Sequence, residues 1–365
     1  MDKKVLIIGL IAFMVMIFTL GCINDKEEPI KIGAVLPLTG PASSIGEDVR
    51  DGMYLAASEI NSHGGVNGRQ IEFIIEDSKT NAEEGISAFK KIEEEHHPDM
   101  YISVLSSVSE ALAPVAEENK VVIIGTVVTT PDFTKDKNYV FRYFSTANGQ
   151  VPPVLSTLDE LNVKNLGIIY LNDPYGKSFF GLAKEEFEKT GGTVRYESFE
   201  TGDTNFKEKI AKLDDTEAIY VVGMTGHIEL ILKQLREENF NGYILSTGAA
   251  TVPSVVSMPE AEGVYAPALA FSNPEFILSK DVSEKYKNKY NKSLNHYSAN
   301  GYDAIKLLGG LFEGKEVSRE NMKVVLDEGF IYSGVLGNVV VKPGEHDIEY
   351  AMYPARIVNK EVKYL

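Results

Sequence analysis

The stretch GAVLPLTGPASSIGEDVRDG, from Gly33 to Gly52, decides the fold. It begins as an apolar run typical of a buried strand, passes through a loop of small residues and ends in a helical pattern. A strand, a loop and a helix in this order form the first unit of an α/β fold. In such folds the loop at the carboxyl end of the first strand faces a ligand crevice. The stretch therefore predicts an α/β protein with a ligand site beside this loop.

The same alternation continues along the chain. Helical patterns follow the strand-like runs; the first places Val49, Met53, Ala56 and Ile60 on one face. Strands alternating with helices at this spacing predict mostly parallel, doubly wound sheets, and the chain is long enough for two lobes. The predicted strands are IKIGAVLPL, QIEFIIEDS, MYISVLSS and KVVIIGTVV, then NLGIIYL, TVRYESF, EAIYVVGM, GYILST and GVYAPALA.

A helix-rich tail follows, over residues 275–290, 298–312 and 318–328. The chain ends in short strand-like pieces, NVVVKPG, IEYAMYPARIV and VKYL. Strands this late in the chain are expected to complete a sheet begun earlier, so the chain should cross between the lobes more than once.

Composition narrows the class of partner. The 365 residues are 44% hydrophobic and 24% charged, with a formal net charge of −17. The negative charge is spread along the chain, which favours solubility and repels nucleic acid and anionic lipid. We therefore expect no nucleic-acid partner.

The amino terminus resembles an export signal. Lys3 and Lys4 precede an uncharged apolar run over residues 5–20, and the chain's single cysteine, Cys22, follows Gly21. One cysteine excludes a disulfide within the chain. We interpret residues 1–22 as a lipoprotein-type signal with acylation at Cys22, and residues 23–29 as a polar tether.

The alternative is an uncleaved signal anchor that carries an incidental cysteine. Both interpretations place the folded part of the chain on the exterior face of the cell membrane, held there by a lipid or by the signal itself.

Catalytic motifs are missing. The sequence has no Gly-x-Ser-x-Gly elbow, no phosphate-binding P-loop and no Gly-x-Gly-x-x-Gly fingerprint. His96 and His97 are adjacent and cannot chelate one ion from a helix. His227 stands at a strand-to-helix turn, where lining a crevice and lying on the surface at a helix start fit equally well. Asp77 could serve as a carboxylate ligand or base, but a polar strand end before a helix cap is the commoner role. We therefore expect no enzyme activity, no cofactor and no metal site.

Three motifs carry a resemblance to a known family. IKIGAVLPLTGPASSIGEDVRDGMYLAASEINSHGGVNGRQIEFIIEDS, IIYLNDPYGKSF and SANGYDAIKLL occur in this order. Together they resemble the branched-chain amino-acid binding proteins, the type I periplasmic solute-binding receptors of ABC importers, over residues 30–365. The resemblance implies a type I periplasmic-binding-protein fold, with two lobes joined by three hinge crossings that close on the ligand. It implies residues 30–146 with 273–335 as the first lobe, and 147–272 with 336–365 as the second.

The resemblance also implies the ligand-binding residues. The first lobe should hold the ligand's carboxylate through hydroxyl and backbone N–H groups, and the second should close with an aromatic ring. The implied residues are Ser106, with Ser107 beside it, Val127, Val128, Thr129, Tyr175 and Tyr297. Ser106 and Thr129 have a plain structural alternative, which is to cap the helices that follow them.

Three positions depart from the family pattern. The acidic residue that pairs with the ligand's ammonium in amino-acid binders falls at Gly248, and two aromatic positions fall at Met224 and Ile45. These three positions remain part of the predicted ligand site. Asp173 could replace the missing acid, although in NDPYG it more often shapes a turn.

We therefore expect a membrane-tethered monomer that captures a branched-chain amino acid or a related small carboxylate and delivers it to an ABC permease. Three alternatives stay open: a sensor for a signalling system, a receptor for an amide or a simple carboxylic acid, and a small-amide hydrolase. The hydrolase would need a nucleophile and a base that the sequence does not offer.

Overall fold

The structure is a computed structural model that describes residues 27–269 and 277–365. The predicted signal segment and Cys22 lie outside the described residues. Within those two ranges, no helix combines the length and the apolar character needed to cross a membrane.

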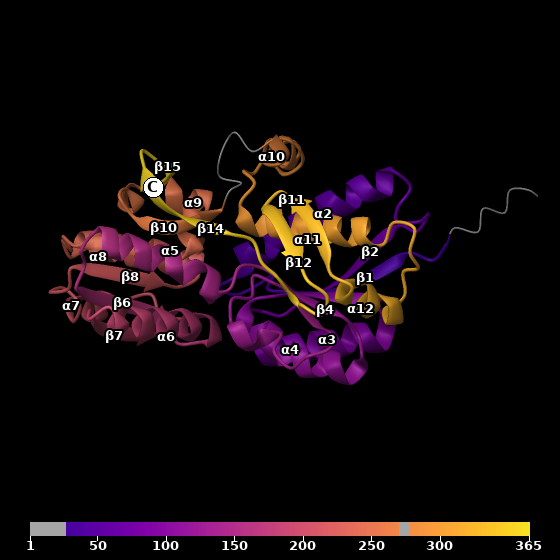
Figure 1. Cartoon of the computed structure of the whole chain (residues 1–365), viewed down its shortest axis with the longest axis horizontal. Helices are drawn as coiled ribbons and strands as arrows, with labels where there is room; N and C mark the ends of the chain where they lie inside the picture. Colours follow the sequence, from indigo (N-terminus) through magenta and orange to yellow (C-terminus); the bar gives the residue numbers. More distant parts are fainter. Residues whose placement is uncertain (1–26, 270–276) are drawn as a thin grey trace, which may run out of the picture.

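Two lobes lie side by side, each built around its own sheet (Figure 1). The first sheet has six strands in the order β13-β5-β4-β3-β1-β2, and all neighbours in it run parallel. This confirms the predicted α/β class with mostly parallel sheets. The strands of this sheet are β1 (Ile30–Leu36), β2 (Ile71–Asp77), β3 (Met100–Val104), β4 (Ile123–Thr126), β5 (Val140–Tyr143) and β13 (Asp347–Ile348).

The second sheet has seven strands in the order β15-β14-β10-β9-β8-β6-β7. Its first five strands along the chain pair in parallel, and the last two add antiparallel at one edge. Its strands are β6 (Asn165–Leu171), β7 (Thr193–Phe199), β8 (Ala218–Val222), β9 (Tyr243–Ser246), β10 (Tyr265–Leu269), β14 (Met352–Val358) and β15 (Glu361–Tyr364). A separate hairpin joins β11 (Phe330–Gly334) to β12 (Gly337–Val341).

Helices cover both faces of each sheet. In the first lobe α2 (Ser43–Ser62) and α11 (His296–Leu311) share one core, while α3 (Ala82–His96) and α4 (Ser106–Asn119) share the other. In the second lobe α5 (Ala147–Glu160) and α6 (Pro174–Lys189) pack on one face. The remaining helices are α7 (Lys207–Ala211), α8 (Thr225–Glu237), α9 (Pro253–Val256), α10 (Ile277–Tyr290) and α12 (Arg319–Asp327), with 3-10 turns η1 (Pro131–Phe133), η2 (Gly248–Thr251) and η3 (Pro259–Ala261).

The nine strands predicted from Ile30 to the end of β10 are all present, but sequence analysis missed β5. This four-residue strand contains Arg142, a charged residue that a short apolar pattern does not anticipate. The Arg142 side chain is fully buried and forms an ion pair of 2.7 Å with Asp347, while also donating hydrogen bonds to the carbonyls of Thr130 and Pro131. The partner lies 205 residues away, so no local pattern announces the strand.

Strand pairing also moves one predicted lobe boundary. The sequence assigned residues 336–365 to the second lobe, yet β13 pairs with β5 in the first sheet. The chain returns to the second sheet between β13 and β14, along the yellow segment that runs between the lobes to β14 in Figure 1. The first crossing lies between β5 and β6, and the predicted boundary at 272/273 falls outside the described residues.

Helices α2 and α11 cross at backbone distance, which holds the late part of the first lobe against its beginning. A methyl group on Gly301 would lie 2.2 Å from the carbonyl oxygen of Val49, and one on Gly52 would lie 1.9 Å from that of Ser298. Both distances are far below van der Waals contact with backbone that cannot move freely. Glycine is therefore required at this crossing for close approach.

We predict that Gly301→Ala lowers the free energy of unfolding by about 3 kcal/mol, because the added methyl group must push the two helices apart. The matched control is Gly310→Ala on the same helix, where an added methyl group meets nothing within 4 Å. That substitution should be neutral or stabilising, since alanine favours helix more than glycine does. Urea unfolding of both variants measures the difference, and equal effects would contradict the packing argument.

Candidate ligand-binding site

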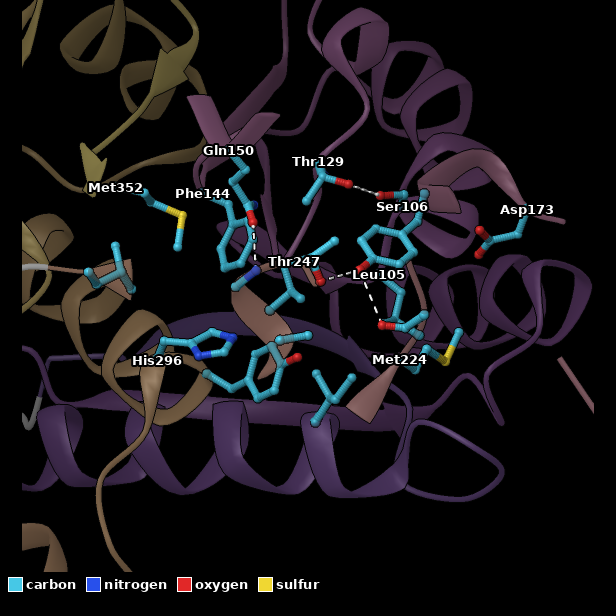
Figure 2. A pocket seen from close by; sticks show the side chains of 18 of the residues that line it. Leu105, Ser106, Thr129, Phe144, Gln150, Asp173, Met224, Thr247, His296 and Met352 are labelled. Carbon is cyan, nitrogen blue, oxygen red and sulfur yellow. Dashed lines mark hydrogen bonds between the residues drawn. The ribbon is translucent and has the colours of Figure 1, made fainter. Parts of the chain in front are cut away.

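A pocket lies between the lobes where the carboxyl ends of strands from both sheets meet. The space in and in front of it that no protein atom fills is about 600 Å³, open solvent at its mouth included. Parallel sheets place ligand crevices at this edge. The lining residues are Ile45, Leu105, Ser106, Val127, Thr129, Phe144, Gln150, Asp173, Tyr175, Gly223, Met224, Thr247, Gly248, Ala249, Leu269, His296, Tyr297, Tyr350 and Met352, most of which Figure 2 shows as sticks.

The first lobe contributes a pair of hydroxyl groups. Ser106, the first residue of α4, accepts a hydrogen bond of 3.1 Å from the backbone N–H of Thr129, and the two side-chain oxygens lie 3.4 Å apart (Figure 2). Neither hydroxyl acts as a helix cap. Leu105 holds the cap position of α4 without a side-chain hydrogen bond, and Thr130 does the same for η1. The capping alternative for Ser106 and Thr129 is therefore wrong.

The start of α4 is suited to an anion. This helix of 14 residues begins at the pocket with no acidic residue in its first turn and, among the described residues, no side chain that caps it. Unpaired N–H groups and the helix dipole together stabilise negative charge at such a terminus.

Two strained residues shape this wall of the pocket. Leu105 has φ of 76° and Val127 has φ of 56°, in the left-handed region that residues with a Cβ rarely adopt. For β-branched Val127 this is a genuine outlier. Such conformations persist where the surrounding structure enforces them, typically at binding sites.

The second lobe contributes an ordered polar wall. The Tyr175 hydroxyl lies 2.9 Å from the Thr247 hydroxyl and donates to the Gly223 carbonyl at 3.2 Å, as dashed lines in Figure 2 show. The Gly248 N–H donates to the side-chain oxygen of Gln150 at 3.3 Å. Burial raises the pKa of Tyr175, so its hydroxyl keeps its proton at neutral pH.

Tyr297 and His296 come from the start of α11. The Tyr297 hydroxyl lies 3.4 Å from the hydroxyl of Thr225 on α8, which links the lobes. The His296 ring is buried in the pocket wall (Figure 2), and its centroid lies 3.9 Å from that of the Tyr297 ring. Burial lowers its pKa to about 3, so the imidazole is neutral.

Most of the remaining lining is apolar. Phe144, Met224, Leu269 and Met352 are side chains without charge, and Ile45 faces the same space. Among the described lining residues there is no lysine or arginine, and Asp173 is the single carboxyl group. The pocket therefore combines an anion-favouring corner with a hydrophobic body.

Eight of the ten predicted ligand residues line this pocket: Ile45, Ser106, Val127, Thr129, Tyr175, Met224, Gly248 and Tyr297. The other two do not. Ser107, next on α4, is partly exposed outside the lining, and Val128 is fully buried in the core beside Phe133. Successive residues on a helix or turn point in different directions, so the neighbour of a pocket residue faces elsewhere.

Sequence analysis missed several pocket residues. Thr247 had a signal, since it follows strand β9 immediately. Five others had none. Gln150 lies on α5, Phe144 directly follows the missed strand β5 and His296 begins α11. Tyr350 and Met352 lie where the chain passes from β13 to β14.

Comparison with known proteins settles the family. The sequence profile of the family described as periplasmic binding protein matches residues 29–361. The chain belongs to this family. Its homologues are solute-binding proteins rather than enzymes, in agreement with the missing catalytic motifs.

Among curated relatives, Leu/Ile/Val-binding protein homolog 3 of Brucella melitensis is 28% identical over 233 residues, covering 62% of this chain and 63% of the relative. The leucine-, isoleucine-, valine-, threonine- and alanine-binding protein of Pseudomonas aeruginosa is 26% identical and covers 58% of each chain. The chain thus spans less than two thirds of the length of these relatives.

Solved structures confirm the fold over nearly the whole chain. The leucine-binding protein LivK of Thermotoga maritima superposes with a TM-score of 0.82 at 26% identity, covering 92% of this chain and 97% of that one. LivJ of Streptococcus pneumoniae, in complex with isoleucine, gives a TM-score of 0.83 at 24% identity with the same coverage. The type I periplasmic-binding-protein fold is therefore confirmed.

Proposed function

We propose that this chain is a receptor that captures a small carboxylate with an apolar side chain, of the branched-chain amino-acid type, and delivers it to an ABC permease. The observation that carries the proposal is the pocket between the lobes, with Ser106 and Thr129 at its anion-favouring corner and apolar side chains around the rest. The relatives are named as leucine-, isoleucine- and valine-binding proteins, which supports this ligand class.

The corner fits a carboxylate without a cationic partner. Hydroxyl donors and the N–H groups at the start of α4 stabilise the negative charge through dipoles. The hydrophobic body fits a branched alkyl group, whose burial contributes about 25 cal/mol per Å² of apolar surface removed from water.

Capture would proceed by hinge closure. Ser106 and Thr129 belong to the first lobe, while Tyr175 and Met224 belong to the second. A ligand that touches both walls stabilises the closed arrangement over the open one by its additional contacts, which shifts the population toward closure.

Delivery of the ligand to a permease requires that the receptor be held at the outer face of the membrane, and we assign this role to the amino terminus. We infer that Cys22 is acylated and that residues 23–29 tether the receptor. Arg69 supports the end of this tether, because its guanidinium donates hydrogen bonds of 2.8 and 3.2 Å to the carbonyls of Glu28 and Pro29. The receptor acts in this scheme as a monomer without a cofactor.

A thermal-shift screen tests the ligand class. Protein starting at Asn24, unfolded and refolded to remove carried-over ligand, is screened with leucine, isoleucine, valine, their deaminated acids and simple amides. A ligand at 100 times its Kd adds about 2.7 kcal/mol to the free energy of unfolding, and we expect the unfolding midpoint to rise by a few degrees with leucine. No shift with any branched acid would contradict the proposal, and a shift with amides alone would replace the ligand class.

The hydroxyl pair can be tested separately. We expect Ser106→Ala and Thr129→Ala each to weaken binding of the ligand from that screen by about 1.5–3 kcal/mol, since each removes a hydrogen bond to a charged group. Ser107→Ala is the matched control, one residue along the helix and outside the pocket, and should leave Kd unchanged. Titration calorimetry measures all three. Equal losses in the Ser107 and Ser106 variants would contradict the assignment.

The proposed acylation of Cys22 can be tested by labelling with a fatty acid. Full-length chain expressed with a labelled fatty acid should incorporate the label and sediment with membranes, whereas Cys22→Ser should not incorporate it, because the chain has no other thiol. Label that persists on the Cys22→Ser chain would rule out acylation at this residue.

A further inference from the structure

Asp173 lines the pocket but takes no part in the hydrogen bonds between Ser106 and Thr129. It is the N-cap residue of α6, and its carboxylate accepts the Gly176 N–H at 2.8 Å. Figure 2 shows Asp173 on the same side of the pocket as Ser106. Among the described lining residues it is the single anionic side chain.

The surroundings of Asp173 leave its charge poorly compensated. Helix α4 of the other lobe packs against α6, and Glu110, one turn beyond Ser106 on α4, adds negative potential. Lys177 on α6 opposes this, but no ion pair within 4 Å joins it to Asp173 in the described part of the chain. Burial, with a smaller contribution from Glu110, raises the pKa of Asp173 to about 6.

We propose that Asp173 determines specificity by pairing with the ammonium group of the ligand, while Ser106 and Thr129 hold its carboxylate. This inference rests on the proposed function and names its substrate class as α-amino acids. A buried carboxylate near a second negative charge is costly until a cation arrives. The ammonium and carboxylate of an amino acid share one carbon atom, so their partners must line the same pocket, as Ser106 at the start of α4 and Asp173 at the start of α6 do.

The rest of the described wall offers no other anion. Gly248 has no side chain, and the space a Cβ would take there is bounded by the Met352 methyl at 2.7 Å and the Gln150 oxygen at 3.1 Å. Neutral His296 supplies no charge. The division of labour also has a mechanical consequence: a zwitterion held by Ser106 on one lobe and Asp173 on the other links the lobes and favours closure.

Asp173→Asn removes the charge and little else. Asparagine caps helices as well as aspartate does, so α6 should persist; Asp173→Ser, another good cap, serves as a second variant. The probe ligands are leucine and 4-methylpentanoate, which differ only in the ammonium group. Calorimetry measures the affinity of wild type and of the variant for each of the two ligands. The four affinities form a double-mutant cycle in which one change is made in the protein and the other in the ligand.

We expect wild type to bind leucine more tightly than 4-methylpentanoate. Asp173→Asn should weaken the affinity for leucine by about 10-fold or more, which is the range expected for a hydrogen bond between charged groups. It should change the affinity for 4-methylpentanoate by less than about 3-fold. Glu110→Gln, which removes a nearby charge outside the lining, should affect leucine less than Asp173→Asn does. Unfolding midpoints establish that each variant is folded.

Each contrary result has its own meaning. Leucine affinity unchanged in Asp173→Asn and Asp173→Ser, or equal losses for both ligands, overturns the pairing. Wild type that prefers 4-methylpentanoate also overturns it, but leaves the proposed carboxylate receptor standing. Binding of neither ligand overturns both.

The pH dependence gives an independent readout. The ionised form of Asp173 binds the ammonium. Because its pKa is about 6, the affinity is present above pH 6 and falls as the pH drops through 6. Glu110, Lys177 and Tyr175 are the ionisable groups around it. Leucine affinity of wild type should fall about 4-fold from pH 7.5 to 5.5, and that of Asp173→Asn should stay flat. A flat profile for wild type contradicts the proposal.

Discussion

Parallel strand pairing is the constraint on which the rest of this structure depends. Because parallel strands end at the same edge, the loops after β3, β4 and β5 gather at one edge of the first sheet, and those after β6, β8 and β9 gather at one edge of the second. The chain crosses between the sheets so that these edges face each other. Residues as distant in sequence as Ile45 and Met352 therefore line one pocket.

The groups at the pocket that can stabilise a negative charge are dipoles, namely N–H and hydroxyl groups, rather than cationic side chains. Helix α4 begins at the pocket wall, and Leu105 and Val127 hold strained backbone there, so the N–H and hydroxyl groups are oriented before a ligand arrives. Preorganised donors lose little entropy on binding. They also spare the protein a buried cation, which would be costly whenever the pocket is empty. A chain with a net charge of −17 repels anions at long range, so capture of the proposed carboxylate would depend on this local arrangement.

The two lobes contribute differently to the site. The first supplies hydroxyls and a helix terminus, and the second supplies Tyr175, Thr247 and the carboxylate of Asp173. The close crossing of α2 and α11 packs backbone against backbone at Gly52 and Gly301 in the first lobe. Under the proposed hinge closure, a ligand held by both walls would favour the closed arrangement of the lobes.

Local sequence determined the α/β class, nine strands up to β10 and most of the pocket loops, because buried parallel strands are continuous apolar runs and small residues follow them. The family resemblance correctly predicted eight residues of the pocket lining, because a loop that follows a given strand lies at the same edge of the sheet in proteins that share the fold. Tertiary structure alone decided the rest. Strand β5 buries Arg142, whose ion-pair partner Asp347 lies 205 residues away, and β13 shifts the third crossing. Side-chain direction separates Ser106 from Ser107 and Thr129 from Val128. Long-range pairing and the direction of a side chain at a turn are set by packing, which no local pattern of residues encodes.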